Sequence, residues 1–317
     1  MGRRIVLQNA DLRVVCLPGH GMLITEIVPQ SHGANLLWQR QDGPLHDFDR
    51  PATATSEADP FDEQVFAGGW FGMFPNAGIP GVLDSGEQMH GSFPREAWKV
   101  VHQGDATLSC TLETDGFEAV RTLRLTENTV RVDTEVTNVR AGDREVSFGE
   151  HPCFSREVFG GGTVLVEADG AHTTNEVSEP GANRFAAGQE FVWPHAEVVG
   201  GGVARVDLVP VEPDASHDHL CVRLADPCVE ISVPRLGGKV SVRSDMGATP
   251  NLLFWRHFRP PASPWRGDVF GIEMMSTPGR TRDDARAADA LRVVRQGETV
   301  KWYLAVSWDV RPISAYS

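Results

Sequence analysis

The chain has 317 residues, of which 41% are hydrophobic and 23% charged, a balance typical of a soluble globular protein with a sizeable core. Its 43 acidic residues outnumber its 29 basic residues, which gives a formal net charge of -14. No basic run offsets this excess, so the chain should repel phosphate backbones and anionic lipid surfaces, and we expect no nucleic-acid or membrane partner.

Cysteine usage and hydropathy bear on localisation. The five cysteines are odd in number, widely spaced and without a CxxC motif, which predicts reduced thiols in a cytoplasmic protein. The N-terminal stretch carries two arginines, but polar residues interrupt its apolar positions, so no signal peptide is expected. No apolar run approaches the roughly 20 residues of a membrane span.

The dominant periodicity along the chain is two, which predicts half-buried β-strands. Apolar and polar residues alternate most clearly over residues 130–136, 229–233, 240–243 and 300–308. Turn signals follow or precede these stretches at Asp115-Gly116, Glu127-Asn128 and Gly237-Gly238. The glycine triplets at residues 160–162 and 200–202 are predicted to be loop tips.

One short helix is predicted around residues 281–289, where charged residues mix with alanines. No series of alternating strands and helices supports a parallel sheet. The predicted fold is therefore all-β: a large antiparallel β-sandwich with at most one or two short helices. No linker or repeat divides the chain, so residues 1–317 are predicted to form a single domain.

Three segments in the first half of the chain are candidates for chemistry. Residues 68–78 are rich in glycine and aromatic residues and do not look like a strand; they suit a sugar-contacting loop, or a buried structural one. His90 precedes Gly91 in a second loop. His151 follows an alternating stretch and precedes Pro152, which predicts a position at a strand end, in the mouth of the sandwich. Either histidine could be purely structural.

Two carboxylates lie near the C-terminus. Glu298 opens the last predicted strand and shares parity with Val300, so a regular strand would turn its carboxylate to the apolar face. Desolvation there would raise its pKa toward that of a useful base; a solvated turn is the alternative. Glu273, in an apolar stretch, is either a buried ion-pair partner or a ligand contact.

Metal and nucleotide chemistry find little support. His217 and His219 have the i, i+2 spacing that could bind a metal from a strand, but their polar surroundings predict a solvated loop. We therefore expect no metal site. The sequence patterns of P-loop nucleotide hydrolases, serine esterases and zinc proteases do not occur.

Taken in order, these segments resemble the aldose 1-epimerase (galactose mutarotase-like) superfamily. The resemblance runs from residues 33–37 to the last strand and rests on Phe74-Pro75-Asn76, His90-Gly91 with Arg95 and Trp98, His151-Pro152, Asp226-Pro227, residues 252–255 and Gly297-Glu298. It implies a galactose mutarotase-like supersandwich with the sugar site in an open cleft, and no cofactor.

The resemblance also implies residue roles. Glu298 would be the general base at the anomeric hydroxyl, His151 the general acid at the ring oxygen, and His90 a stabiliser of developing charge. The residues implied or suspected to bind the sugar or support the site are Asn76, Arg95, Glu150, Asp226 and Glu273, and Glu273 also rivals Glu298 as the base.

The predicted function is interconversion of the α and β anomers of an aldose by acid–base ring opening, for which a histidine and a desolvated glutamate suffice near neutral pH. The short spacing between Asn76 and His90 is similar to that of a branch related to hexose-6-phosphate mutarotases. That branch's arginine before the loop is absent, since residues 67–69 are Ala-Gly-Gly, so a non-phosphorylated small sugar is expected.

Two other functions remain open. One is a non-catalytic carbohydrate-binding or sensing protein on the same sandwich. The other is a lyase or glycoside-acting enzyme, for which Glu273 and Glu298 could supply the two carboxylates that glycoside hydrolysis needs.

Overall fold

A computed structural model describes residues 4–41, 61–62, 64–84, 86–174, 183–261, 263 and 266–310. Their strands up to residue 155 are β1 (Ile5–Gln8), β2 (Leu12–Leu17), β3 (Leu23–Pro29), β4 (Trp70–Met73), β5 (Lys99–Gln103), β6 (Thr107–Thr114), β7 (Phe117–Thr126), β8 (Thr129–Asn138), β9 (Arg144–Val146) and β10 (Gly149–Ser155). The later strands are β11 (Val164–Thr173), β12 (Glu190–Phe191), β13 (His195–Glu197), β14 (Val203–Arg205), β15 (His217–Val233), β16 (Gly238–Ser244), β17 (Asn251–Phe258), β18 (Asp268–Met275), β19 (Arg292–Val294) and β20 (Thr299–Val310). Short helical segments are α2 (Arg156–Phe159), η2 (Pro234–Leu236) and α3 (Arg282–Ala287).

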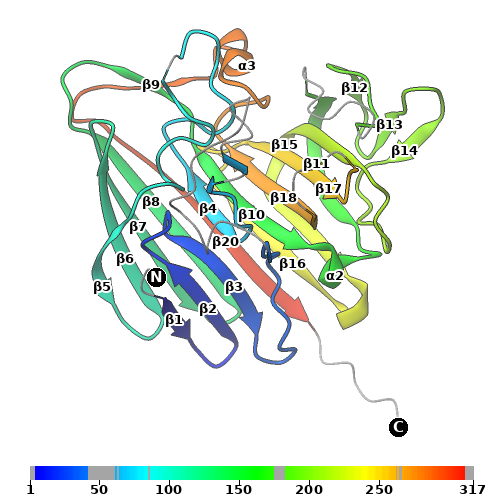
Figure 1. Ribbon diagram of the computed structural model, residues 1–317, viewed down its shortest axis with the longest axis horizontal. Helices are drawn as coiled ribbons and strands as arrows, with labels where there is room; N and C mark the ends of the chain where they lie inside the picture. Colours follow the sequence, from blue (N-terminus) through cyan, green and yellow to red (C-terminus); the bar gives the residue numbers. More distant parts are fainter. Residues whose placement is uncertain are drawn as a thin grey trace.

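The long strand β15 organises the molecule: β11 pairs along one edge of it, and two branches of one antiparallel sheet leave from its other edge. Figure 1 shows the resulting arrangement of the strands. Its first half pairs with β17 and leads through β18, β10, β4, β3 and β2 to β1. Its second half pairs with β16 and leads through β20, β8, β7 and β6 to β5. The two branches face each other and form the two layers of a sandwich.

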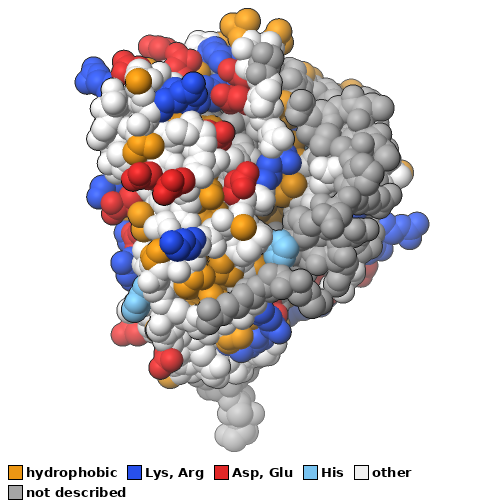
Figure 2. Space-filling view, turned by 60° about the vertical axis from the view of Figure 1, so that its left-hand side comes forward, with side chains coloured by type: hydrophobic (Ala, Val, Ile, Leu, Met, Phe, Trp, Pro, Cys, Tyr) orange, Lys and Arg blue, Asp and Glu red, His pale blue; other side chains and the backbone are white. Residues whose placement is uncertain are grey.

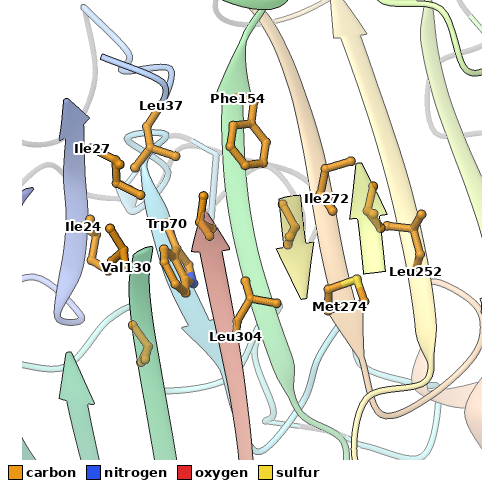
Figure 3. Close-up of a cluster of buried hydrophobic side chains, with 14 of the residues drawn as sticks. Ile24, Ile27, Leu37, Trp70, Val130, Phe154, Leu252, Ile272, Met274 and Leu304 are labelled. Atoms are coloured by element: carbon orange, nitrogen blue, oxygen red, sulfur yellow. The ribbon is translucent and has the colours of Figure 1, made fainter. Parts of the chain in front are cut away.

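The main hydrophobic core fills the space between the branches (Figure 3). Trp70, Phe154 and Ile272 of the first branch face Val130 and Leu304 of the second. Because side chains alternate along a strand, the residues between these core positions project from the opposite face of the first branch. A second apolar cluster, which includes Phe61, Phe66 and Phe71, covers that opposite face, so β4, β10, β17 and β18 are buried on both sides.

The structure confirms the all-β antiparallel fold and most local predictions. The alternating stretches lie in β8, β15, β16 and β20, with their apolar members buried. Asp115 and Gly116, with φ values of 55° and 82°, make the two-residue hairpin turn between β6 and β7. The predicted helix is α3, capped by the side chain of Thr281. Residues 200–202 form the exposed tip between β13 and β14.

Three local predictions were wrong. Residues 70–73 form strand β4; no alternation marks it, since both its faces are buried. His151 lies inside β10 rather than at a strand end, because the strand continues past Pro152 with only a local gap in its pairing to β18. His217 and His219 begin β15 and are buried, not in a solvated loop.

On the face turned forward in Figure 2, acidic and basic side chains are interspersed. Ion pairs of this kind on the outer surface include Arg124 with Asp133 and Lys301 with Glu135. Within the described ranges, no helix is both long and apolar enough to cross a membrane.

Candidate active site

A cavity of about 610 Å³, the open solvent at its mouth included, opens on the face of β4, β10, β18, β17 and β15 that is turned away from the sandwich core. Cross-strand register brings its lining together, as Phe71 pairs with His151, Leu253 with Glu273, and Trp255 with His219. The described residues that line it are Phe61, Asp62, Phe66, Gly78, Ile79, Met89, His90, His151, His217, His219, Leu253, Trp255, His257, Ser263, Glu273 and Arg280.

His151 and Glu273 form a buried pair on neighbouring strands. β10 and β18 pair at Glu150 with Met274 and again at Cys153 with Gly271, and the same register places His151 opposite Glu273. The Nε2 atom of His151 lies 3.2 Å from Oε1 of Glu273, and both side chains are at most 5% exposed. The other carboxylate oxygen, Oε2, is buried and has no hydrogen-bond partner among the described residues. A buried carboxylate oxygen without a hydrogen-bond donor can accept a hydrogen bond from a ligand.

Opposing effects set the charge of His151. Burial lowers its pKa, but the negative charge of Glu273, together with Cys153 and hydrogen bonds to both, outweighs burial and raises the pKa to about 10. His151 is therefore an imidazolium near neutral pH, paired with the Glu273 carboxylate. An acid and a base thus stand side by side at one wall of the cavity.

His90 reaches the same place from a tight loop. It has a φ of 61°, and the next residue must be glycine because a Cβ on Gly91 would lie 2.1 Å from the Phe74 carbonyl oxygen. The Nδ1 atom of His90 lies 2.9 Å from the Ala77 carbonyl oxygen, which can only accept, so Nδ1 carries the proton and Nε2 is the acceptor. Burial, and then the charge of His151, hold the pKa of His90 well below its usual value. The neutral ring meets His151 edge-on at 5.5 Å.

Three further histidines, His217 and His219 of β15 and His257 of β17, surround Trp255, whose ring also meets His151 edge-on at 5.8 Å. The Trp255 indole donates to Nε2 of His217 at 2.8 Å. Burial lowers the pKa of His219 well below its usual value and that of His257 to about 2, so both are neutral. Sequence reasoning considered His217 and His219 only as metal ligands and assigned them to a solvated loop, and it missed His257, although the i, i+2 spacing of Trp255 with His257 was a usable signal. Among the described residues, no set of side chains is arranged to hold a metal ion.

The structure does not bring Glu298 to this cavity. Glu298 precedes β20, just after Gly297 in a turn with a φ of 77°, and its carboxylate accepts from the Arg295 N–H at 2.9 Å and pairs with Arg292. The Arg295 N–H and the nearby arginine charges lower its pKa. The inward orientation inferred from strand parity is therefore corrected: the side chain folds back over its own turn, because the strand begins only at Thr299.

Glu150 is also placed away from the cavity. It precedes His151 on β10, so its side chain points to the opposite face, into the sandwich core. Its carboxylate accepts two bonds from Arg121 at 2.7 and 3.0 Å and one from each of the indoles of Trp70 and Trp302, at 2.8 and 3.0 Å. This corrects the prediction that Glu150 contacts a sugar: it is an internal ion-pair partner.

The other predicted binding residues do not line the cavity. Asp226 makes an exposed ion pair with Arg243 on the surface. Asn76 is buried and donates to the Gly78 carbonyl oxygen at 2.7 Å, so it shapes the loop behind His90. Arg95 lies over the Phe61 ring at 5.4 Å and is not one of the described residues that line the cavity. Glu273, in contrast, stands in the cavity next to His151, which makes it both an ion-pair partner and a possible ligand contact.

The charge of His151 can be measured directly. We expect its ring protons to titrate with a pKa near 10 in an NMR titration, against 6.5 in the unfolded chain. Between these two pKa values the folded protein holds a proton that the unfolded chain has lost. The His151 pair should therefore make its full contribution to the unfolding free energy below pH 6.5, and this contribution should fall as the pH rises toward 10. A His151 that titrates at or below pH 6.5 would contradict the imidazolium–carboxylate pair.

Comparison with known proteins gives the fold its class. No family model and no curated protein matches the sequence. Solved structures do match: the Slr1438 protein of Synechocystis sp. PCC 6803 (TM-score 0.69, 17% identity) aligns over 98% of this chain and 97% of its own. A candidate aldose 1-epimerase of Escherichia coli K12 (0.68, 15%) and a galactose mutarotase related enzyme of Lactobacillus acidophilus (0.67, 13%) each align over 98% of this chain and 99% of their own.

Identities this low are informative about the fold alone. The chain has the galactose mutarotase-like fold, which confirms the fold class predicted from its sequence.

Proposed function

We propose that this protein is an aldose 1-epimerase, which interconverts the α and β anomers of a small sugar in the cavity around His151 and Glu273. One observation carries the proposal. The buried Oε2 of Glu273 lacks a hydrogen-bond donor among the described residues, next to a histidine that burial alone would leave neutral but that Glu273 keeps protonated. A bound hydroxyl group supplies the missing donor, and the anomeric hydroxyl is the most acidic one of an aldose.

The reaction needs only these two groups. Glu273 takes the proton of the anomeric hydroxyl as the bond between C1 and the ring oxygen breaks and C1 becomes a carbonyl carbon. The Nε2–H of His151 gives its proton to the ring oxygen. Rotation about C1–C2 and ring closure with the two residues in reversed roles yield the other anomer and restore both charges. This revises the role expected of Glu298, whose place as base Glu273 takes.

The geometry of the pair suits a proton that must move. The separation of 3.2 Å between His151 Nε2 and Glu273 Oε1 is longer than the roughly 2.7–2.9 Å of a tight charge-assisted hydrogen bond. A ring oxygen can therefore share the Nε2–H without first displacing a strong bond. The neutral His90, edge-on to His151, adds an acceptor nitrogen for a sugar hydroxyl without adding a competing charge.

The remaining lining suits a sugar ring. Trp255 and Phe66 offer aromatic faces for the C–H surface of a pyranose. His219 and His257 are neutral, and a neutral imidazole has one donor and one acceptor nitrogen, which matches a hydroxyl group. We place the anomeric end of the sugar at His151 and the rest of the ring toward Trp255.

The test is a panel of freshly dissolved single-anomer sugars, including hexoses and their 6-phosphates, followed by polarimetry or NMR. We expect faster relaxation to anomeric equilibrium for at least one unphosphorylated aldose. Saturable binding of sugars with no acceleration for any of them would overturn the enzymatic proposal in favour of carbohydrate binding or sensing.

Loss of the Trp255 indole should weaken sugar binding more than it slows turnover. For Trp255→Leu we expect KM to rise about tenfold, equivalent to about 1.4 kcal/mol of lost binding, with a smaller change in kcat. Trp193→Leu is a matched control, because Trp193 packs against Phe254 on the core side and does not line the cavity. An unchanged KM in Trp255→Leu would remove Trp255 from the sugar site.

A further inference from the structure

We propose that Cys153 is the positioning residue for His151: its buried thiol holds Nδ1 of the imidazole, so that Nε2 is always the nitrogen that faces Glu273 and exchanges the working proton. The proposal rests on the proposed function for its catalytic consequence. The contact itself is a separate structural claim, and it can be tested without turnover.

The contact joins two residues on the same face of one strand. Cys153 follows His151 by two positions in β10, so both side chains project toward the cavity face. The Sγ atom lies 3.3 Å from Nδ1 of His151, and Cys153 is fully buried behind the cavity wall. The thiol is therefore out of reach of substrate, and its place in the site is behind the catalytic histidine.

The backbone fixes the thiol from both sides. The Cys153 N–H donates to the Gly69 carbonyl oxygen at 2.8 Å, and the Cys153 carbonyl oxygen accepts from the Trp38 N–H at 2.9 Å. Gly69 itself has no room for a side chain, since a Cβ there would lie 2.5 Å from the Ile24 carbonyl oxygen. The sulfur thus sits on a part of β10 that has little freedom to shift.

Apolar packing alone cannot orient the His151 ring. Phe71 stacks on the His151 ring at 4.6 Å. Gly271 of the neighbouring strand β18 leaves just enough space for the ring, because a Cβ on Gly271 would lie 3.0 Å from Cε1 of His151. These contacts fix the plane of the ring, but a half-turn about Cβ–Cγ keeps that plane and exchanges Nδ1 with Cδ2 and Nε2 with Cε1. In the turned ring, a carbon atom would face Glu273. The Cys153 sulfur meets the Nδ1 edge and distinguishes the two orientations.

A thiol can form a hydrogen bond with Nδ1 in both protonation states of the His151 ring. Burial raises the pKa of Cys153, which keeps it as S–H. Such a group accepts weakly from the Nδ1–H of the imidazolium and remains a partner of the same nitrogen after Nε2 has given up its proton. The other described titratable and charged groups that line the cavity with His151 are Glu273 of β18, His217 and His219 of β15, His257 of β17, and His90, Asp62 and Arg280 from loops and a short turn.

The experiment compares Cys153→Ala, Cys153→Val and Cys153→Ser. Alanine and valine remove the hydrogen bond, and valine keeps most of the volume, whereas serine restores a group that can donate and accept. We expect kcat for mutarotation to fall about tenfold in the first two with KM within twofold of wild type, and Cys153→Ser to recover to within about threefold. Cys221→Ala is the matched control, since Cys221 is a buried thiol of the same apolar cluster but lies on β15, where it pairs with Leu253.

Nitrogen-15 NMR of the His151 ring separates this proposal from the proposed function. In the wild type we expect Nδ1 to stay protonated throughout the titration, and in Cys153→Ala and Cys153→Val we expect a changed tautomer ratio or a second ring orientation. A valine variant that folds with wild-type kcat and wild-type nitrogen shifts would overturn the proposal. If the wild type accelerates no sugar, the proposed function fails, while the nitrogen shifts still decide whether Cys153 holds the ring.

Discussion

Replacement of Glu273 by glutamine is expected to reduce kcat for mutarotation by about 10²- to 10⁴-fold, the usual range for loss of a positioned general base. The amide cannot take the anomeric proton. It also removes the charge that keeps His151 protonated, because burial alone would lower the pKa of His151. The same substitution should therefore lower the pKa of His151, so that one change disables both the base and the acid. Polarimetry and an NMR titration of the variant measure the two effects.

Glu298→Gln is the matched control for this result. Glu298 is a carboxylate near the C-terminus whose partners are Arg292 and the Arg295 N–H in its own turn, away from the cavity. We expect its kcat and KM to match those of wild type. If Glu298→Gln lost activity and Glu273→Gln kept it, Glu298 would be the base after all and the cavity would not be the active site.

Replacement of Glu150 by alanine is expected to destabilise the protein by about 3–5 kcal/mol, because it leaves the Arg121 guanidinium buried without a counter-charge. Both side chains of the pair are 1% exposed. The indole N–H groups of Trp70 and Trp302 would also lose their acceptor. Since whole domains have about 5–15 kcal/mol of stability, this is a large share of the total. Urea or guanidinium unfolding of the variant measures it.

Two comparisons show whether the cost comes from the uncompensated charge. Lys301→Ala breaks an ion pair that is 63% and 52% exposed, and should cost no more than about 1 kcal/mol. The double replacement Arg121→Met with Glu150→Met removes both charges and should recover much of the stability lost in Glu150→Ala. If Glu150→Ala unfolded at the same denaturant concentration as the wild type, the Arg121–Glu150 ion pair would be dispensable for stability.

The sequence determined the fold class through local pattern. A period of two identifies strands wherever one face is buried and the other is solvated, as in β8 and β20, and hairpin turns such as Asp115-Gly116 require residues that accept a positive φ. The same reasoning failed for β4 and for His151 in β10, because strands buried on both faces show no alternation. Motif order also marked His90 and His151, which the structure brings to one cavity.

Only the tertiary structure decided which carboxylate accompanies those histidines. Glu273 meets His151 because the register of β10 on β18 sets them opposite each other, and pairing between strands about 120 residues apart leaves no local signal in the sequence. The alternation of side chains sends Glu150 to the core and its neighbour His151 to the cavity. A single turn at Gly297 folds Glu298 back onto the surface. Local pattern therefore gave the strands, and register between distant strands gave the site.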